Sequence, residues 1–249
     1  MPFRKQSLSF VTVCVGKPYI DYFAEIIKSY GKLSFPESTK LYVNTNHLLY
    51  AIEKLKDSPI DIEFIDFGPL LKQYQIDEKD YRNNDCIKVH AFINALDLDK
   101  NDFLFYVDAD MEAHMFNQEK FDEVFDQGGF YHELCHTYKT RDDIEEHTNK
   151  RVKQILNMGY NLQFMKNEKG DIIFPIERFW GLRRSFCDNE RYFKNEFTDL
   201  FNQMIFGGLR NDLYTESVEL GHCFSKFFEK NKHINQGLAF IETSGVPLD

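Results

Sequence analysis

The stretch FLFYVDAD, residues 103–110, decides the fold class of this chain. Five apolar residues in succession, 103–107, are typical of a central β-strand that is covered on both faces of its sheet. Two aspartates follow at once, and in open α/β sheets ligands bind outside the carboxyl ends of the strands. Alternate side chains of an extended segment point the same way, so we expect Asp108 and Asp110 on one side and Ala109 on the other.

Two neighbouring carboxylates in apolar surroundings repel each other, and this repulsion predicts a metal site. A hard divalent ion, Mn²⁺ or Mg²⁺, that links Asp108 and Asp110 to a diphosphate would relieve the repulsion. The alternative is a solvated turn after the strand, because aspartate is common in turns.

Strands and helices alternate along the chain before this stretch, which predicts an α/β domain with a mixed, mostly parallel sheet. Beyond residue 110 the pattern is less regular. The absence of a Pro- or Ser-rich linker favours a single domain over residues 1–249. The expected strands cover residues 8–15, 40–43, 60–67 and 103–107, and the expected helices cover 19–30, 48–55, 85–96, 141–153 and 214–230.

Composition excludes several classes of function. The net charge is −10, with 30 basic and 40 acidic side chains, and general binding of duplex nucleic acid is disfavoured because it depends on neutralising phosphates. The chain has no apolar run of the roughly 18 to 20 residues that a membrane-spanning helix needs. Its five cysteines are scattered, without a Cys-x-x-Cys pair, which predicts reduced thiols in a cytoplasmic protein.

A second motif, His132-Glu133-Leu134-Cys135-His136, points to a different chemistry. On a helix, histidines at i and i+4 can share a Zn²⁺ while the glutamate acts as general base, so a zinc metallopeptidase is an alternative function. A diglycine precedes the motif closely, where such an enzyme needs one or two apolar helical turns. We therefore favour two histidines on an irregular loop.

The segment Val107–Glu112, VDADME, resembles the Val-Asp-x-Asp-Met-Glu signature of glycosyltransferase family 6, which holds the histo-blood-group A and B transferases and the α-1,3-galactosyltransferases. Other segments resemble further motifs of this family in the same order along the chain. They are residues 13–19, 41–45, 86–88, 129–131 and 204–208.

This resemblance implies the GT-A fold, a Rossmann-like nucleotide-sugar-binding architecture. Residues 1–110 would form the nucleotide-binding half and residues 111–249 the acceptor- and sugar-binding half. The implied reaction is metal-dependent transfer of a hexose from a UDP-sugar to a hydroxyl acceptor, with retention of the α configuration and Mn²⁺ (or Mg²⁺) held by Asp108 and Asp110. The donor-binding positions that it implies are Val13, Cys14, Val15, Tyr19, Lys88, Asp108, Ala109, Asp110, Asn202, Met204, Gly207 and Gly208.

The chain departs from the family where the family has a Trp-His-Asp-Glu segment, whose glutamate is the proposed nucleophile or acceptor-binding base. Asn235 and Gln236 stand there instead, and we expect front-face attack by the acceptor hydroxyl. The catalytic candidates are Gln236, Glu133 as a base and Lys88 as a cation near the diphosphate. Long, apolar Met204 favours an unsubstituted sugar over an N-acetyl sugar.

The sequence does not identify the acceptor. A glycan, a glycolipid, a protein or a modified base in DNA would each supply a hydroxyl. The family's vertebrate members carry a transmembrane anchor that this chain lacks, which favours a cytoplasmic enzyme of a bacterium or of a virus-infected cell. A non-catalytic sugar-binding module is the third functional class, although it has no need of two acids at a strand end.

Overall fold

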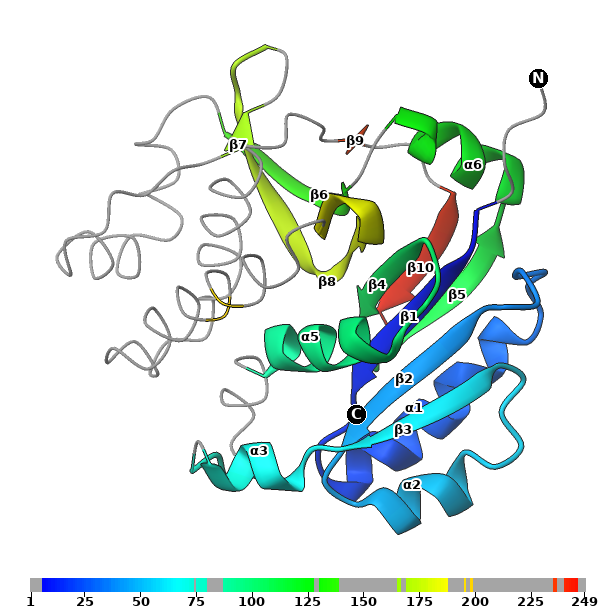
Figure 1. Cartoon of the computed structure of the whole chain (residues 1–249), viewed down its shortest axis with the longest axis vertical. Helices are drawn as coiled ribbons and strands as arrows, with labels where there is room; N and C mark the ends of the chain where they lie inside the picture. The colour runs from blue at the N-terminus through cyan, green and yellow to red at the C-terminus, as the bar shows by residue number, and fades with distance from the viewer. Residues whose placement is uncertain are drawn as a thin grey trace, which may run out of the picture.

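The computed structural model describes residues 6–73, 75–79, 87–127, 130–138, 165–166, 169–187, 195, 198, 235–236 and 240–245. The first part of the chain alternates strands and helices, as the sequence predicts, and its last strand coincides with the expected one (Figure 1). These elements are β1 (Leu8–Val13), α1 (Lys17–Tyr30), β2 (Lys40–Thr45), α2 (Leu48–Lys54), β3 (Asp61–Asp66), α3 (Gly68–Gln73), α5 (Lys88–Leu98) and β4 (Phe103–Val107).

The later elements are mainly strands. They are β5 (Met111–Phe116), α6 (Gln118–Gln127), β6 (Phe130–Tyr138), β7 (Met165–Lys166), β8 (Ile172–Arg183), the 3-10 helix η1 (Arg184–Cys187), β9 (Asn235–Gln236) and β10 (Ile241–Gly245). The helices expected at 141–153 and 214–230 lie outside the described residues.

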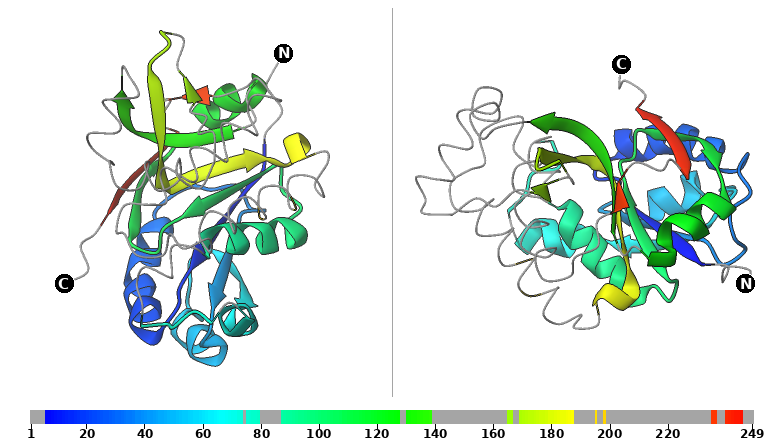
Figure 2. Two further views of the ribbon diagram at one scale, coloured as in Figure 1. Left: turned by 90° about the vertical axis from the view of Figure 1, so that its left-hand side faces the viewer. Right: turned by 90° about the horizontal axis from the view of Figure 1, so that it is seen from above.

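Eight strands of the described part form one mixed sheet in the order β3-β2-β1-β4-β8-β6-β9, with β7 paired to β8. The strands β3, β2, β1 and β4 are parallel, as the alternation of strands and helices requires. Strand β8 enters antiparallel to both β4 and β6. The β6–β8 part therefore extends the sheet away from α1 and α2 (Figures 1 and 2). Separately, β5 and β10 form a two-stranded antiparallel sheet.

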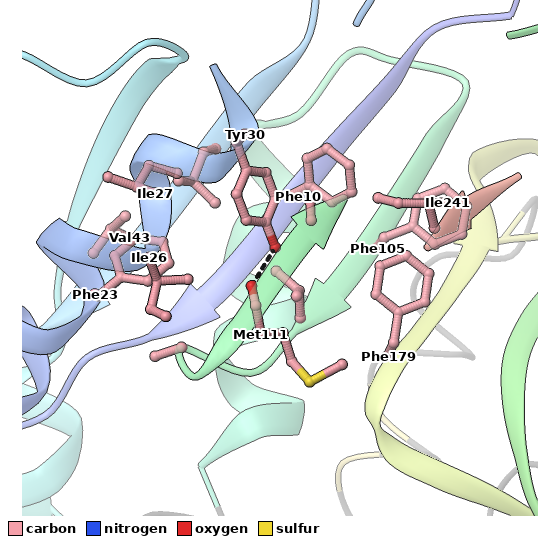
Figure 3. Close-up of a cluster of buried hydrophobic side chains, with 14 of the residues drawn as sticks. Phe10, Phe23, Ile26, Ile27, Tyr30, Val43, Phe105, Met111, Phe179 and Ile241 are labelled. Atoms are coloured by element: carbon pink, nitrogen blue, oxygen red, sulfur yellow. Dashed lines mark hydrogen bonds between the residues drawn. The ribbon is translucent and has the colours of Figure 1, made fainter. Parts of the chain in front are cut away.

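Successive residues of β4 point to opposite faces of the sheet, which gives the sheet a packed layer on each side. Phe105 belongs to the aromatic and aliphatic cluster that includes Tyr30 of α1 and Phe179 of β8 (Figure 3). Tyr106, on the other face, stacks on Trp180, and Trp180 lies against Phe92 of α5 with 4.5 Å between ring centroids. The continuous apolar run in β4 thus reflects burial on both faces, as predicted.

Strand β8 can lie this close to β4 because of Gly181. A Cβ at this position would lie 2.1 Å from Cδ1 of Phe105 and 2.7 Å from the carbonyl oxygen of Leu104, closer than any real contact allows. Trp180, beside this glycine, is fully buried, in line with the core role that its apolar neighbours suggest.

Helix α2 forms as expected but does not bury all the apolar residues that its spacing suggests. Leu49 is 82% exposed and Ile52 is 42% exposed, so the buried face of this short helix is narrower than the pattern implies. No helix in the described part of the chain is both long and apolar enough to cross a membrane.

Candidate functional site

The acidic pair follows β4 in a tight turn. The N–H of Met111 donates to the carbonyl oxygen of Asp108 at 3.1 Å, and the N–H of Asp108 donates to the carbonyl oxygen of Arg178 on β8 at 2.9 Å. The extended conformation expected for 108–110 is therefore wrong. The chain turns here because β5 leaves the main sheet to pair with β10. Ala109, expected to face away, is buried in this turn.

Asp108 is held by one hydroxyl and one ammonium group. The hydroxyl of Tyr106 donates to Oδ1 at 2.8 Å, and Nζ of Lys88 lies 3.1 Å from Oδ1 and 3.4 Å from Oδ2. The Lys88 side chain is only 9% exposed, so Lys88 is not a solvated surface lysine. It approaches from the first turn of α5 and also lies over the ring of Tyr106.

The pKa of Asp108 rises to about 6, mainly because burial disfavours the charged carboxylate. The charge of Asp110 raises it further, while Lys88 and the hydrogen bond from Tyr106 act in the opposite direction. The lysine therefore offsets only part of the cost of two adjacent carboxylates. A further positive charge at this turn would stabilise both.

Within the ranges that the structure describes, one carboxylate oxygen of Asp110 lacks the hydrogen bond that buried polar atoms usually make. Its Oδ1 is buried, and it has no hydrogen-bond partner among the described residues. Buried polar atoms are nearly always satisfied, so such an oxygen requires an explanation. A pair of carboxylates with an unsatisfied oxygen is a donor set that suits a hard, oxygen-seeking cation such as Mn²⁺ or Mg²⁺. The residues present fit the ion that the sequence predicts.

The carboxyl end of β1 lies beside that of β4, because the two strands are parallel neighbours with Val11 opposite Tyr106. The predicted donor-binding residues Val13, Cys14 and Val15 thus lie next to the acidic turn. Cys14 is fully buried, and burial raises the pKa of its thiol well above the usual range, which makes it chemically inert. Tyr19, in the first turns of α1, is half-buried.

Two predicted catalytic residues lie further across the sheet. The register places Tyr106, Trp180, His132 and Gln236 in one row over four strands. Gln236 is therefore three strand spacings, roughly 14 Å, from Tyr106. Glu133 follows His132 on β6, two strands from β4. Both residues share a sheet with the acidic turn.

The His-Glu-x-x-His motif lies on strand β6, not on a helix or an irregular loop. Both expectations for this segment are therefore wrong, because β6 pairs with β8 along most of its length, with local register shifts. In a strand, residues four apart are separated by roughly 13 Å, whereas helical i,i+4 neighbours are about 5–6 Å apart. The spacing that makes the motif a zinc site on a helix does not exist here.

The four remaining donor-binding positions, Asn202, Met204, Gly207 and Gly208, lie outside the described residues. Two residues at the site, Tyr106 and Arg178, are not among those predicted from the sequence. Tyr106 had a local signal, since it is two positions before Asp108 and so shares its face of the strand. Arg178 had none, because it reaches the turn only through the pairing of β8 with β4.

No protein-family model matches the sequence, and a comparison with curated proteins finds no significant match. Solved structures do match in fold. Core-mannan synthase A from Aspergillus fumigatus, in a form with Mn and GDP, aligns over 97% of this chain and 75% of its own, with a TM-score of 0.57 at 9% identity. Mouse xyloside xylosyltransferase 1 aligns over 93% and 85%, with a TM-score of 0.49 at 9% identity.

The match to core-mannan synthase A defines the class of architecture. The chain has an α/β GT-A fold with a mixed, mostly parallel central sheet, as the sequence predicts.

Proposed function

We propose that the protein is a metal-dependent glycosyltransferase that uses a nucleotide sugar as donor and a hydroxyl group as acceptor. The observation that carries the proposal is the buried Oδ1 of Asp110, which has no hydrogen-bond partner in the described ranges, beside the Lys88–Asp108 ion pair at the carboxyl end of the central strand. This is the edge where open α/β sheets bind ligands. The GT-A fold supports the same function.

Each residue at the turn has a distinct role in this proposal. Asp108 and Asp110 would hold the divalent ion. Tyr106 and Lys88 orient Asp108, and Lys88 adds positive charge close to the diphosphate. A bound Mn²⁺ or Mg²⁺ supplies Lewis-acid stabilisation of the departing nucleoside diphosphate. These groups act on charge that develops in the transition state, the kind of stabilisation that contributes most to catalysis.

The finer features of the reaction rest on the resemblance to glycosyltransferase family 6. They are a UDP-hexose donor, retention of the α configuration and placement of Asn202, Met204, Gly207 and Gly208 around the sugar. Gln236 and Glu133 are the proposed acceptor-side residues, and attack occurs on the front face of the donor. The acceptor is a glycan, a glycolipid or another hydroxyl compound.

The direct test is a nucleotide-sugar panel on protein stripped of metal with EDTA. UDP-glucose, UDP-galactose, UDP-N-acetylglucosamine and GDP-mannose are each added with and without Mn²⁺, and melting temperature and nucleotide release are measured. We expect a UDP-hexose to raise the melting temperature and to be hydrolysed slowly, in both cases only with Mn²⁺. Equal responses in EDTA, or no response to any donor, would contradict the proposal.

The same panel separates the other functional classes. Binding without release of the nucleotide indicates a non-catalytic sugar-binding module. One zinc per chain in protein purified without added metal, lost in His132→Ala, would return the peptidase to consideration despite the strand geometry of β6.

A further inference from the structure

Arg178 lies at the acidic turn and has no role in the function proposed above. Its carbonyl oxygen accepts the hydrogen bond from the N–H of Asp108, which fixes its backbone directly beside the turn. Its side chain is exposed. Within the described part of the chain, its guanidinium forms no hydrogen bond or ion pair, although the protein carries an excess of acidic side chains.

The position of the guanidinium is set by Gly245, the last residue of β10. A Cβ at residue 245 would lie 2.8 Å from Nη1 of Arg178 and 3.9 Å from Sδ of Met111. Gly245 is also the register partner of Met111, the residue that follows Asp110. The guanidinium therefore rests on the β10 backbone at the point where β10 meets the acidic turn.

Lys88 and Arg178 approach this turn from different elements. Lys88 comes from α5, on the face of the sheet where Tyr106 stacks on Trp180. The guanidinium of Arg178 comes from β8 and lies against the last residue of β10, the strand that pairs with β5. The ammonium of Lys88 is already engaged by Asp108. The guanidinium of Arg178 is available to a ligand.

The charge balance of the proposed site calls for such a group. Two carboxylates and the diphosphate of a nucleotide sugar carry more negative charge than one divalent ion and Lys88 neutralise. The deficit grows when the bond to the sugar breaks and the departing phosphate takes up its electrons. Arginine is suited to fill it, because its planar fork donates two parallel hydrogen bonds to phosphate oxygens.

We propose that Arg178 is a second cationic ligand of the donor diphosphate, in addition to Lys88, and that Gly245 keeps its guanidinium in place. This inference rests on the proposed function and deepens it. The site then holds the diphosphate with two cations that come from different elements, α5 and β8. Residue 245 must lack a side chain for Arg178 to reach the ligand.

The test is calorimetric binding of UDP, GDP and UMP to metal-saturated protein, with Mn²⁺ binding alone measured first. In Arg178→Gln we expect about tenfold weaker binding of the preferred diphosphate, since one hydrogen bond to a charged group is lost. Affinity for Mn²⁺ alone and for UMP should change less than threefold. Arg178→Lys should recover part of the loss. Lys120→Gln, which removes one exposed charge on α6, serves as the matched control and should bind as the wild type does.

Gly245→Ala tests the geometry independently. The added methyl meets only the end of a flexible side chain and Met111 Sδ at an ordinary distance, so the fold should persist, as melting temperature can verify. We expect a several-fold loss of diphosphate affinity in the wild-type background and no further loss in Arg178→Gln, because the two changes act through one group.

Unaltered diphosphate affinity in Arg178→Gln, with Asp110→Asn still abolishing it, would overturn the inference and leave the proposed function intact. Wild-type protein that binds neither UDP nor GDP with Mn²⁺ would overturn both. Additive losses in the double variant would show that Gly245 does not act through Arg178.

Discussion

The two ends of β4 use the same residue type for opposite purposes. At the amino end, Asp102 accepts hydrogen bonds through Oδ2 from the N–H of Ser7 at 3.0 Å and from its hydroxyl at 2.9 Å. The N–H of Asp102 donates back to the Ser7 hydroxyl at 3.0 Å. Asp99 accepts through Oδ1 from the hydroxyls of Ser9 and Tyr42. Through these hydrogen bonds, Asp99 and Asp102 connect β1 and β2 to the segment that precedes β4.

The described contacts of the carboxylates at the carboxyl end of β4 do not connect neighbouring strands in this way. Among the described residues, Asp108 is held by Tyr106 from its own strand and by Lys88 from α5, and Oδ1 of Asp110 has no hydrogen-bond partner. Asp99 also keeps one unpartnered oxygen, but its second oxygen has two donors. Asp108 and Asp99 each have two side-chain donors, so donor number does not separate the two ends. The difference is that Asp110 lies close enough to Asp108 for its charge to raise the pKa of Asp108. A pair of adjacent carboxylates, and not the presence of aspartate alone, marks the ligand-binding end.

The largest expected effect comes from removing the charge at the carboxyl end. Asp110→Asn should lower Mn²⁺-dependent nucleotide affinity and donor turnover by more than about 100-fold, since a metal ligand that also stabilises transition-state charge contributes several kcal/mol. Asp108→Asn should act in the same direction. Isothermal calorimetry and nucleotide release measure the two losses.

The matched control for these variants is Asp102→Asn, at the other end of the strand, which should keep nucleotide affinity within about twofold because it lies far from the metal pair. Full turnover of the wild type in EDTA would refute the assignment of the pair to a metal.

A second, smaller effect is a pH dependence of stability that Asp108 should cause in metal-free protein, in the same direction as that of Asp99, whose pKa burial also raises. The pKa of Asp108 rises from 3.8 to about 6, so the neutral form is favoured by folding. Protonated Asp108 therefore contributes its full stabilisation of the fold below pH 4, and this contribution is lost as pH rises through about 6. Asp108→Asn, which stays neutral, should therefore gain up to about 3 kcal/mol of unfolding free energy relative to wild type between pH 4 and pH 7.

Urea unfolding in EDTA at several pH values gives this difference. If the difference in unfolding free energy between Asp108→Asn and wild type stays constant with pH, burial does not raise the pKa of Asp108. Saturating Mn²⁺ should reverse its sign at pH 7, because the ion binds the charged carboxylate.

The smallest effect is expected at the amino end. Asp102→Ala removes two hydrogen bonds to Ser7 and should lower the free energy of unfolding by about 1–3 kcal/mol, with no change in nucleotide affinity. Chemical denaturation and calorimetry on the same sample measure both. A loss of nucleotide affinity without a loss of stability would contradict this assignment, since it would indicate a ligand-binding role for the amino end of β4.

The local sequence pattern predicted the strands of the parallel half and three of its helices, α1, α2 and α5, but not α3. The run 103–107 predicted β4 to the residue, and the break after it predicted the position of the acidic pair. Both are properties of short segments: an apolar run long enough for a buried strand, followed by residues that cannot be buried without a partner. Lys88 was also found from the sequence, although its burial was not.

The antiparallel half was not predictable in the same way. Strand β6 reads as a metal-binding helix motif, because His132 and His136 have the helical spacing whatever conformation the chain adopts. Pairing with β8 decides its conformation, and β8 comes more than thirty residues later. The turn at 108–110 was misjudged for a similar reason, because its shape depends on the pairing of β5 with β10.

The sequence by itself determined the α/β class, the central strand and the two carboxylates at its end, because these depend on apolar runs and on residues adjacent in the chain. Only the tertiary structure decided that Lys88 is buried against Asp108, that Oδ1 of Asp110 has no partner in the described part of the chain, and that Arg178 rests on Gly245. These contacts join segments 20 to 70 residues apart. Their strength depends on burial and on the surrounding charges, which no local pattern contains.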